Sequence, residues 1–195
     1  MIKFNKNVKK ILPYNRKHYM DYLHDDGESE VQWYGFSFQL DNIKEISLAE
    51  FVEKYINWFK NIVSKVDNGS YWIVNHDKND QNWFPNDEDN LTHLRTLFKQ
   101  NNVPNTFRGA LVFTKDELFE FSEDLISYPY AVFDDVNLFY TDLDISYSEF
   151  PFIIKILDHL NIDLLSTNKE FLREIVNENS SNLFNIIQYT GTSLL

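Results

Sequence analysis

The chain has 195 residues, no cysteine and a formal net charge of −12 at pH 7. This length is typical of one domain, and the missing cysteines exclude disulfides, thiolate nucleophiles and zinc–thiolate sites. No apolar stretch is long enough to cross a bilayer, so we expect a cytoplasmic protein without a membrane span.

The charge is unevenly distributed. Residues 1–20 carry six basic residues and no acidic one, so the other 175 residues carry −18. We therefore predict a basic N-terminal arm or first helix over residues 1–20 and a single domain over residues 21–195. Because phosphates require Lys and Arg to displace their counterions, this acidic body is not expected to bind nucleic acid directly; a basic protein or a cation is the better complement.

The clearest predicted element is a helix over residues 47–67, where apolar side chains recur at steps of three and four. Ser47 and Glu50 have the spacing of a capping box, and Asn68-Gly69 supplies a left-handed stop. A stripe of this length has to be covered, and a sheet built from the strand-like runs that follow is the natural cover.

The remaining elements alternate at first, and strands cluster later. Residues 2–12 have a loose helical pattern, and residues 18–27 resemble a loop. Further helices are predicted over residues 90–100, 115–126 and 168–177, the last one capped by Ser166 or Thr167. Strands are predicted over residues 31–40, 71–75, 107–113, 151–157, 162–165 and 183–189, with two short ones within 130–145. The pattern indicates an α+β fold, with a mixed or mainly antiparallel sheet and about four helices largely on one face.

Common catalytic motifs are absent. The five glycines cannot form either of the usual phosphate-binding loops, and neither a nucleophile elbow nor a zinc-protease motif occurs. Ser166 and Lys169 have the S-x-x-K spacing, but a helix cap explains Ser166 better.

A metal site is one alternative. Residues 77–88 can be aligned with a twelve-residue calcium loop, although Asn82 stands where glycine is required and a strand precedes it. A histidine cluster could form instead if the next helix approaches the loop. A solvated loop is the simpler interpretation. The residues of this metal hypothesis, which would bind a divalent cation or support a metal-dependent enzyme, are His76, Asp77, Asn79, Glu88 and His93.

Two carboxylate pairs could serve acid–base chemistry, Asp134 with Asp135 and Asp142 with Asp144. The second pair would point to the same face if its segment is a strand. In a chain this acidic, such pairs are also expected without any catalytic meaning.

A binding surface is the preferred hypothesis. The acids of the predicted helix 115–126 have no basic residue three or four positions away, and Trp83 and Phe84 lie within an acidic run. These two rings either anchor their loop or form an exposed hot spot for a partner. We predict a non-enzymatic module that binds a basic protein through an acidic and aromatic face made of Trp83, Phe84, Asp87, Glu88, Asp116, Glu117, Glu120, Glu123 and Asp124.

This profile of a small, acidic, cysteine-free α+β chain is similar to that of intracellular immunity and antitoxin proteins, which mask a basic toxin. The likeness concerns the general profile and transfers no residue. A third hypothesis is a small-ligand-binding domain with an aromatic pocket.

Overall fold

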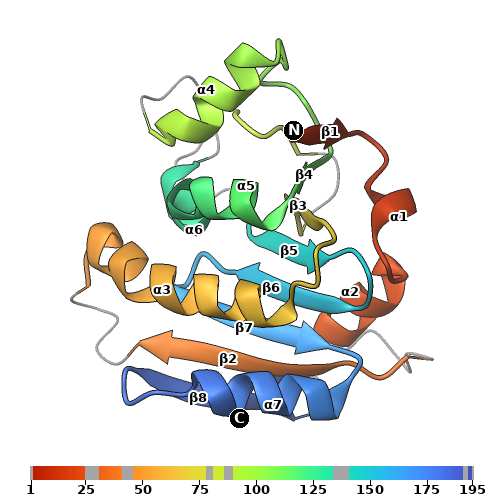
Figure 1. Cartoon of the computed structure of the whole chain (residues 1–195), viewed down its shortest axis with the longest axis vertical. Coiled ribbons are helices and arrows are strands. Elements are labelled where there is room, and N and C mark those ends of the chain that lie inside the picture. The colour runs from red at the N-terminus through yellow and green to blue at the C-terminus, as the bar shows by residue number, and fades with distance from the viewer. Residues whose placement is uncertain are drawn as a thin grey trace.

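An antiparallel sheet runs through the molecule, with helices on both of its faces (Figure 1). The computed structural model describes residues 2–24, 31–40, 46–77, 81–85, 90–133, 141–190 and 193–194. The strands follow one another across the sheet in the order β1-β4-β3-β5-β6-β7-β2-β8-β9. Their bounds are β1 Lys3–Asn5, β2 Tyr34–Leu40, β3 Trp72–His76, β4 Ala110–Phe113, β5 Leu143–Tyr147, β6 Phe152–Ile156, β7 Asn161–Ser166, β8 Phe184–Thr190 and β9 Ser193–Leu194.

Helices cover the two faces unequally. In Figure 1, α3, α5 and α7 lie in front of the sheet and α2 lies behind it. The main core lies between the sheet and the front helices, and two smaller apolar clusters lie under α1 and α2. The helices are α1 Val8–Ile11, α2 Arg16–His24, α3 Leu48–Val66, α4 Thr92–Gln100, α5 Lys115–Glu120, α6 Ser122–Ala131 and α7 Lys169–Asn179.

The alternation of the strands separates the two faces. In β6, Ile154 belongs to the main core, whereas Ile153 packs with Tyr19 of α2 and Lys155 lies on the same side as Ile153. Since both faces are covered, every residue of β3, β5, β6 and β7 is buried. The few polar residues in these strands therefore require hydrogen-bond or ion-pair partners within the protein.

The predicted fold class is confirmed: the chain is α+β with an antiparallel sheet. The long helix is α3, and its predicted capping box between Ser47 and Glu50 is present. The described residues contain seven helices, more than the four or so predicted, and α1 and α2 lie on the second face.

Some predicted elements were wrong. Residues 2–12 form β1 and then the short α1 rather than one helix, and most of the predicted loop at 18–27 is α2. The cap of α7 is Asn168, whose side chain accepts from the Phe171 amide, while Ser166 accepts from the Asn168 amide. Of the two strands predicted within residues 130–145, the second corresponds to the start of β5, and residues 134–140 lie outside the described part.

The predicted helix 115–126 is two helices, and the second continues past its expected end. α5 and α6 meet at Phe121, and α6 runs through Pro129 to Ala131. Pro129 lies in the last turn, where its ring disrupts few of the helix's hydrogen bonds. Tyr128 and Tyr130 on either side are buried and hydrogen-bonded, which holds this turn in place.

Within the described residues, no helix combines the length and the apolar character needed to cross a membrane.

Candidate functional site

A row of buried polar residues crosses the sheet on the face that α2 covers. Asn75 of β3 is the register partner of Asp144 of β5, which pairs with Lys155 of β6; Lys155 pairs with Asp163 of β7, and Asp163 with Ser37 of β2. All five are buried. Five neighbouring strands thus each contribute one polar side chain at the same level.

Lys155 is the centre of this row. Its Nζ lies 3.3 Å from Asp77 Oδ2, 3.3 Å from Asp142 Oδ2 and 3.4 Å from Asp144 Oδ1. The side chains of Lys155 and Asp144 are 5% and 1% exposed, whereas those of Asp77 and Asp142 are 12% and 18% exposed. The four residues, called the lysine cluster below, therefore approach solvent on the side of Asp77 and Asp142.

One ammonium cannot neutralise three carboxylates. Burial alone would lower the pKa of Lys155, but Asp144, Asp77 and Asp142 outweigh it and raise that pKa well above its ordinary value. Burial raises the pKa of both Asp142 and Asp144, and Lys155 only partly offsets this. Lys155 therefore keeps its proton, while the carboxyls of Asp142 and Asp144 hold protons more readily than an ordinary aspartate does.

Residues from α2 and from the segment before β5 complete the cluster. Arg16 donates to the backbone carbonyls of His76 and Asp77, and the Tyr19 hydroxyl donates to Asp144 Oδ1 at 3.1 Å. Thr141 Oγ1 donates to Asp77 Oδ1 at 2.7 Å. One face of α2 is thereby tied to β3 and β5 through polar groups rather than through apolar packing alone.

Two acceptor atoms in the row receive no hydrogen bond from any of the described residues. They are Asp144 Oδ2 and Asn75 Oδ1, which are buried and belong to cross-strand partners. Unsatisfied buried acceptors are uncommon because each costs on the order of 1–3 kcal/mol. A proton on the Asp144 carboxyl would supply the missing donor for Asn75.

The structure separates the residues of the metal hypothesis. His76 and Asp77 are sequence neighbours, and their side chains point to opposite sides of the sheet, as strand geometry requires. His76 is buried in the main core, with its ring 4.7 Å from that of Trp83, whereas Asp77 belongs to the lysine cluster. His93 is exposed on α4, and Asn79 and Glu88 lie outside the described residues.

His76 is also a poor ligand in its own right. Its Nε2 is 2.9 Å from the Tyr128 hydroxyl, which donates to the Trp83 carbonyl. Burial lowers the pKa of His76 to about 3, so the ring is neutral, and its Nε2 is already hydrogen-bonded inside the core. Over the part of the chain that is described, no group of three or more His, Asp or Glu side chains is arranged to hold a metal ion.

Trp83 and Phe84 do not belong to an exposed face. They are 0% and 2% exposed, and Trp83 Nε1 donates to the Gly109 carbonyl at 3.0 Å. The Phe84 ring packs edge-on against Phe98 of α4 and lies beneath Arg95. The interpretation as a loop anchor holds, and the hot-spot interpretation is wrong, because the two rings fill the space between α4, α6 and the sheet.

The predicted acidic residues that the structure describes fall into two groups. Asp116 and Glu120 are exposed and four residues apart on α5, and Glu123 is exposed in the first turn of α6. Glu117 is half-buried in a capping box with Thr114, and Asp124 accepts from the Leu94 amide at 2.8 Å. Asp87 and Glu88 lie outside the described residues. The first three form the acidic stripe, a name used below for Asp116, Glu120 and Glu123 only.

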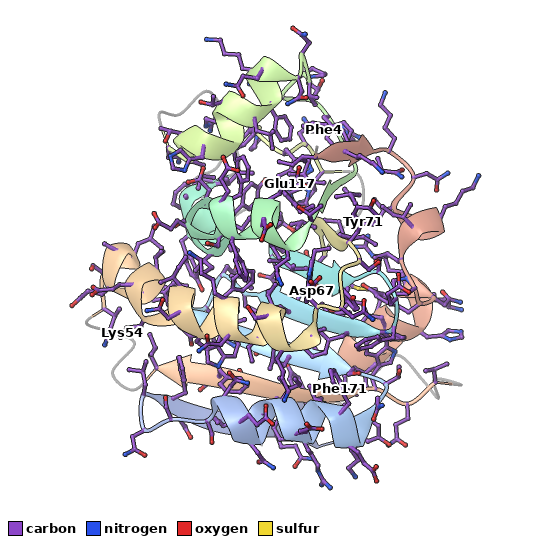
Figure 2. All side chains as sticks on the ribbon, in the orientation of Figure 1. Phe4, Lys54, Asp67, Tyr71, Glu117 and Phe171 are labelled. Atoms are coloured by element: carbon purple, nitrogen blue, oxygen red, sulfur yellow. The ribbon has the colours of Figure 1, made fainter. Side chains whose placement is uncertain are left out.

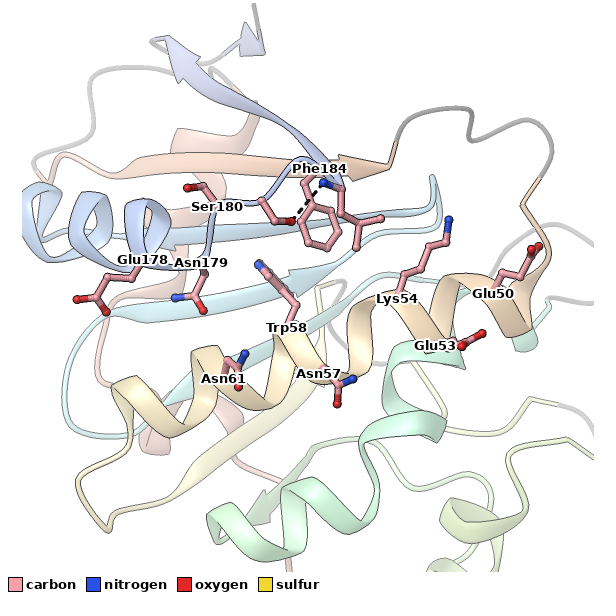
Figure 3. Close-up of a pocket in the computed structure, with 12 residues that line it drawn as sticks. Glu50, Glu53, Lys54, Asn57, Trp58, Asn61, Glu178, Asn179, Ser180 and Phe184 are labelled. Carbon is pink, nitrogen blue, oxygen red and sulfur yellow. Dashed lines mark hydrogen bonds between the residues drawn. The ribbon is translucent and has the colours of Figure 1, made fainter.

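A groove opens on the helical side between α3, the end of α7 and the start of β8 (Figure 3). Its volume is about 560 Å³. Trp58 and Phe184 contribute to its floor, and Glu50, Glu53 and Glu178 lie around it with Lys54. The groove was not predicted from the sequence, because α3 and α7 are more than a hundred residues apart in the chain.

The sequence also left Lys155, Arg16 and Tyr19 unassigned, although it identified the Asp142 and Asp144 pair. The prediction that this pair would share a face is confirmed, since both carboxylates contact Lys155. No protein-family model, curated protein or solved structure matches the chain significantly.

Proposed function

We propose that this protein is a non-enzymatic binding module that engages a basic protein partner through the acidic stripe. The observation that supports this most directly concerns the ion pairs of the stripe in the described part of the chain. Among the described residues, no ion pair joins Asp116, Glu120 or Glu123 to a Lys or Arg.

The nearest basic residue in the sequence is directed elsewhere. Lys115 Nζ lies 3.7 Å from Oδ2 of Asp67, a residue labelled in Figure 2 at the end of α3. The Asp67 side chain is only 4% exposed, so the charge of Lys115 is paired with a largely buried carboxylate outside the stripe. Within the stripe, Asp116 and Glu120 are four residues apart on α5, and like charges at this spacing destabilise a helix by a few tenths of a kcal/mol. A basic partner would relieve this repulsion.

The exposed location and the sign of the charge define the partner class. The stripe would repel nucleic-acid phosphates and attract Lys and Arg side chains, with association rates that fall as ionic strength rises. We place this binding in the cytoplasm, with which the cysteine-free sequence is compatible.

A charge-reversal experiment tests the proposal. The purified protein would capture partners from a lysate of its source organism at low salt, and the basic proteins retained would be identified and titrated individually by calorimetry. We expect the Glu120→Lys/Glu123→Lys variant to lose binding by at least about tenfold, since two attractive contacts become repulsive.

The matched control is Glu170→Lys/Glu174→Lys on α7, which changes the net charge equally at exposed acids outside the stripe. It should retain binding. Equal loss in both variants would mean that only net charge matters, and unchanged binding in the stripe variant would contradict the proposal.

A further inference from the structure

The turn that follows α3 contains Asn68-Gly69, the only Asn-Gly pair in the chain. Both residues are exposed, and Gly69 has a φ of 98° with no heavy atom beyond its chain neighbours within 4 Å of the place where a Cβ would be. An asparagine followed by glycine is chemically labile, because no side chain shields the backbone nitrogen that can attack the asparagine carboxamide. This pair is therefore a candidate for deamidation, a modification that requires no enzyme.

The reaction has two steps. The Gly69 nitrogen gives up its proton and bonds to Cγ of Asn68, while the bond from Cγ to the carboxamide nitrogen breaks. The proton leaves with that nitrogen as ammonia, and a five-membered succinimide remains. Water then opens the succinimide: addition at Cγ gives aspartate, and addition at the main-chain carbonyl gives isoaspartate, in which the backbone continues through the former side chain. No oxidant, reductant or cofactor is involved.

Tyr147 of β5 holds the Asn68 side chain in a fixed position. The Asn68 amide donates to the Tyr147 hydroxyl at 3.0 Å, and that hydroxyl donates to Asn68 Oδ1. One hydroxyl thus bridges the backbone nitrogen and the side-chain oxygen of the same residue. Tyr147 is fully buried, and its ring lies 5.0 Å from that of Trp72, its register partner in β3. The carboxamide therefore has to leave a rigid partner before it can rotate into position for attack.

The attacking nitrogen is also held. The Gly69 N–H donates to Asp67 Oδ2 at 3.2 Å. The Asp67 carboxylate is fixed in turn, because its Oδ1 accepts from Trp72 Nε1 at 3.1 Å and Lys115 Nζ lies 3.7 Å from Oδ2. The N–H is thereby directed at a carboxylate of the preceding turn rather than at Cγ of Asn68. The sequence supplies the reactive pair, and the fold restrains both of its reacting groups.

We propose that Asn68 is a deamidation site and that the Tyr147 hydroxyl restrains the reaction in the folded protein. Conversion adds one negative charge beside Asp67 at the C-terminal end of α3, where the helix dipole disfavours negative charge. The isoaspartyl form also adds a methylene to the backbone between α3 and β3. Because α3 packs on the main core, we expect modified molecules to be less stable. The acidic stripe has no part in this proposal.

The test follows amide-to-acid conversion in the full chain at neutral pH by digestion and mass spectrometry, with chromatography to separate aspartyl from isoaspartyl peptides. Asn68→Asp supplies the standard for the aspartyl product. Tyr147→Phe keeps the buried ring and removes the hydroxyl, and we expect it to speed conversion at Asn68 by about fivefold, as for the loss of one hydrogen bond. In denaturing urea, wild type and variant should react equally, and both should react faster than the folded wild type.

The matched control is Tyr130→Phe, which removes another buried hydroxyl, one that contacts Leu157 and Leu160 instead of the turn. It should leave the rate at Asn68 unchanged. Equal acceleration in both variants would mean that general destabilisation controls the reaction, and a slower reaction in Tyr147→Phe would mean that the hydroxyl assists it; either result would overturn the restraint. Conversion of another asparagine ahead of Asn68 in the folded wild type would overturn the assignment of the site.

Discussion

Lys155 and Asp144 face each other across β5 and β6, with Nζ 3.4 Å from Oδ1 and both side chains almost fully buried. An ammonium in this position holds three carboxylates together between three neighbouring strands. Removing one member of a buried ion pair is far more costly than the net contribution of the pair, because the remaining charges stay desolvated and uncompensated.

Lys155→Met should therefore destabilise the protein strongly. Methionine keeps most of the length of the side chain but removes the ammonium that contacts Asp77, Asp142 and Asp144, and we expect a loss of about 3–5 kcal/mol in the free energy of unfolding. Urea denaturation at pH 7 measures it. Lys99→Met, at an exposed position on α4, is the control and should change stability by less than about 0.5 kcal/mol. A loss below about 1 kcal/mol in Lys155→Met would show that the ammonium does not hold the cluster together.

Asp144→Asn should be tolerated much better than Lys155→Met. Burial raises the pKa of Asp144, so the folded protein binds its proton more tightly than the unfolded chain does. The stability that the protonated Asp144 carboxyl contributes is then complete below the ordinary aspartate pKa of about 3.9. It is lost as the pH rises through the pKa of Asp144 in the folded protein. The asparagine amide imitates the protonated carboxyl and can donate to Asn75 Oδ1.

The corresponding measurement compares the stabilities of wild type and Asp144→Asn from about pH 4 to pH 8. We expect the wild type to lose stability relative to the variant as pH rises. A variant that becomes progressively less stable than wild type over this range would show instead that the ionised carboxylate is the stabilising form.

Local patterns predicted the local elements well. The helix over residues 47–67 and its capping box depend on neighbours within a few residues, and α3 reproduces both. The aromatic anchor at residues 83–84 was one of two interpretations, and the sequence could not choose between them because the space that the rings fill is made by α4, α6 and the sheet.

Long-range features could be predicted only in part. Lys155 is the single charge in the apolar run 151–157, and a lone charge in a buried strand has to be paired, so its importance could have been inferred. Its partners could not, since they depend on the pairing of β3, β5 and β6. α2 was missed because polar residues such as Arg16 and Tyr19 form part of its inner face, which hides the apolar period.

His76 should limit stability in acid. Burial lowers the pKa of His76 to about 3. Below about pH 6.5 the imidazole is therefore protonated in the unfolded chain but stays neutral in the folded protein. The stability that this group contributes is complete above about pH 6.5 and falls towards pH 3, by at most about 1.4 kcal/mol per pH unit. His76→Phe keeps an aromatic ring against Trp83 and Tyr128 and removes the titration. Denaturation midpoints between pH 4 and pH 7 should therefore decrease less in the variant than in wild type; parallel decreases would contradict a buried neutral imidazole.

Asp124 should stabilise α4 rather than bind a partner. The N-cap residue of α4 is Leu91, which has a φ of 50° and makes no side-chain capping hydrogen bond. The Asp124 carboxylate instead accepts from the Leu94 amide at 2.8 Å. Losing a capping carboxylate costs about 1 kcal/mol, so Asp124→Ala should lower the free energy of unfolding by that amount and speed hydrogen exchange in the first turn of α4. Glu123→Ala next to it removes an exposed acid of the stripe and should affect partner binding more than stability. The reverse pattern would be weaker partner binding by Asp124→Ala with hydrogen exchange in α4 as in wild type. It would support the prediction from the sequence that Asp124 belongs to the binding surface.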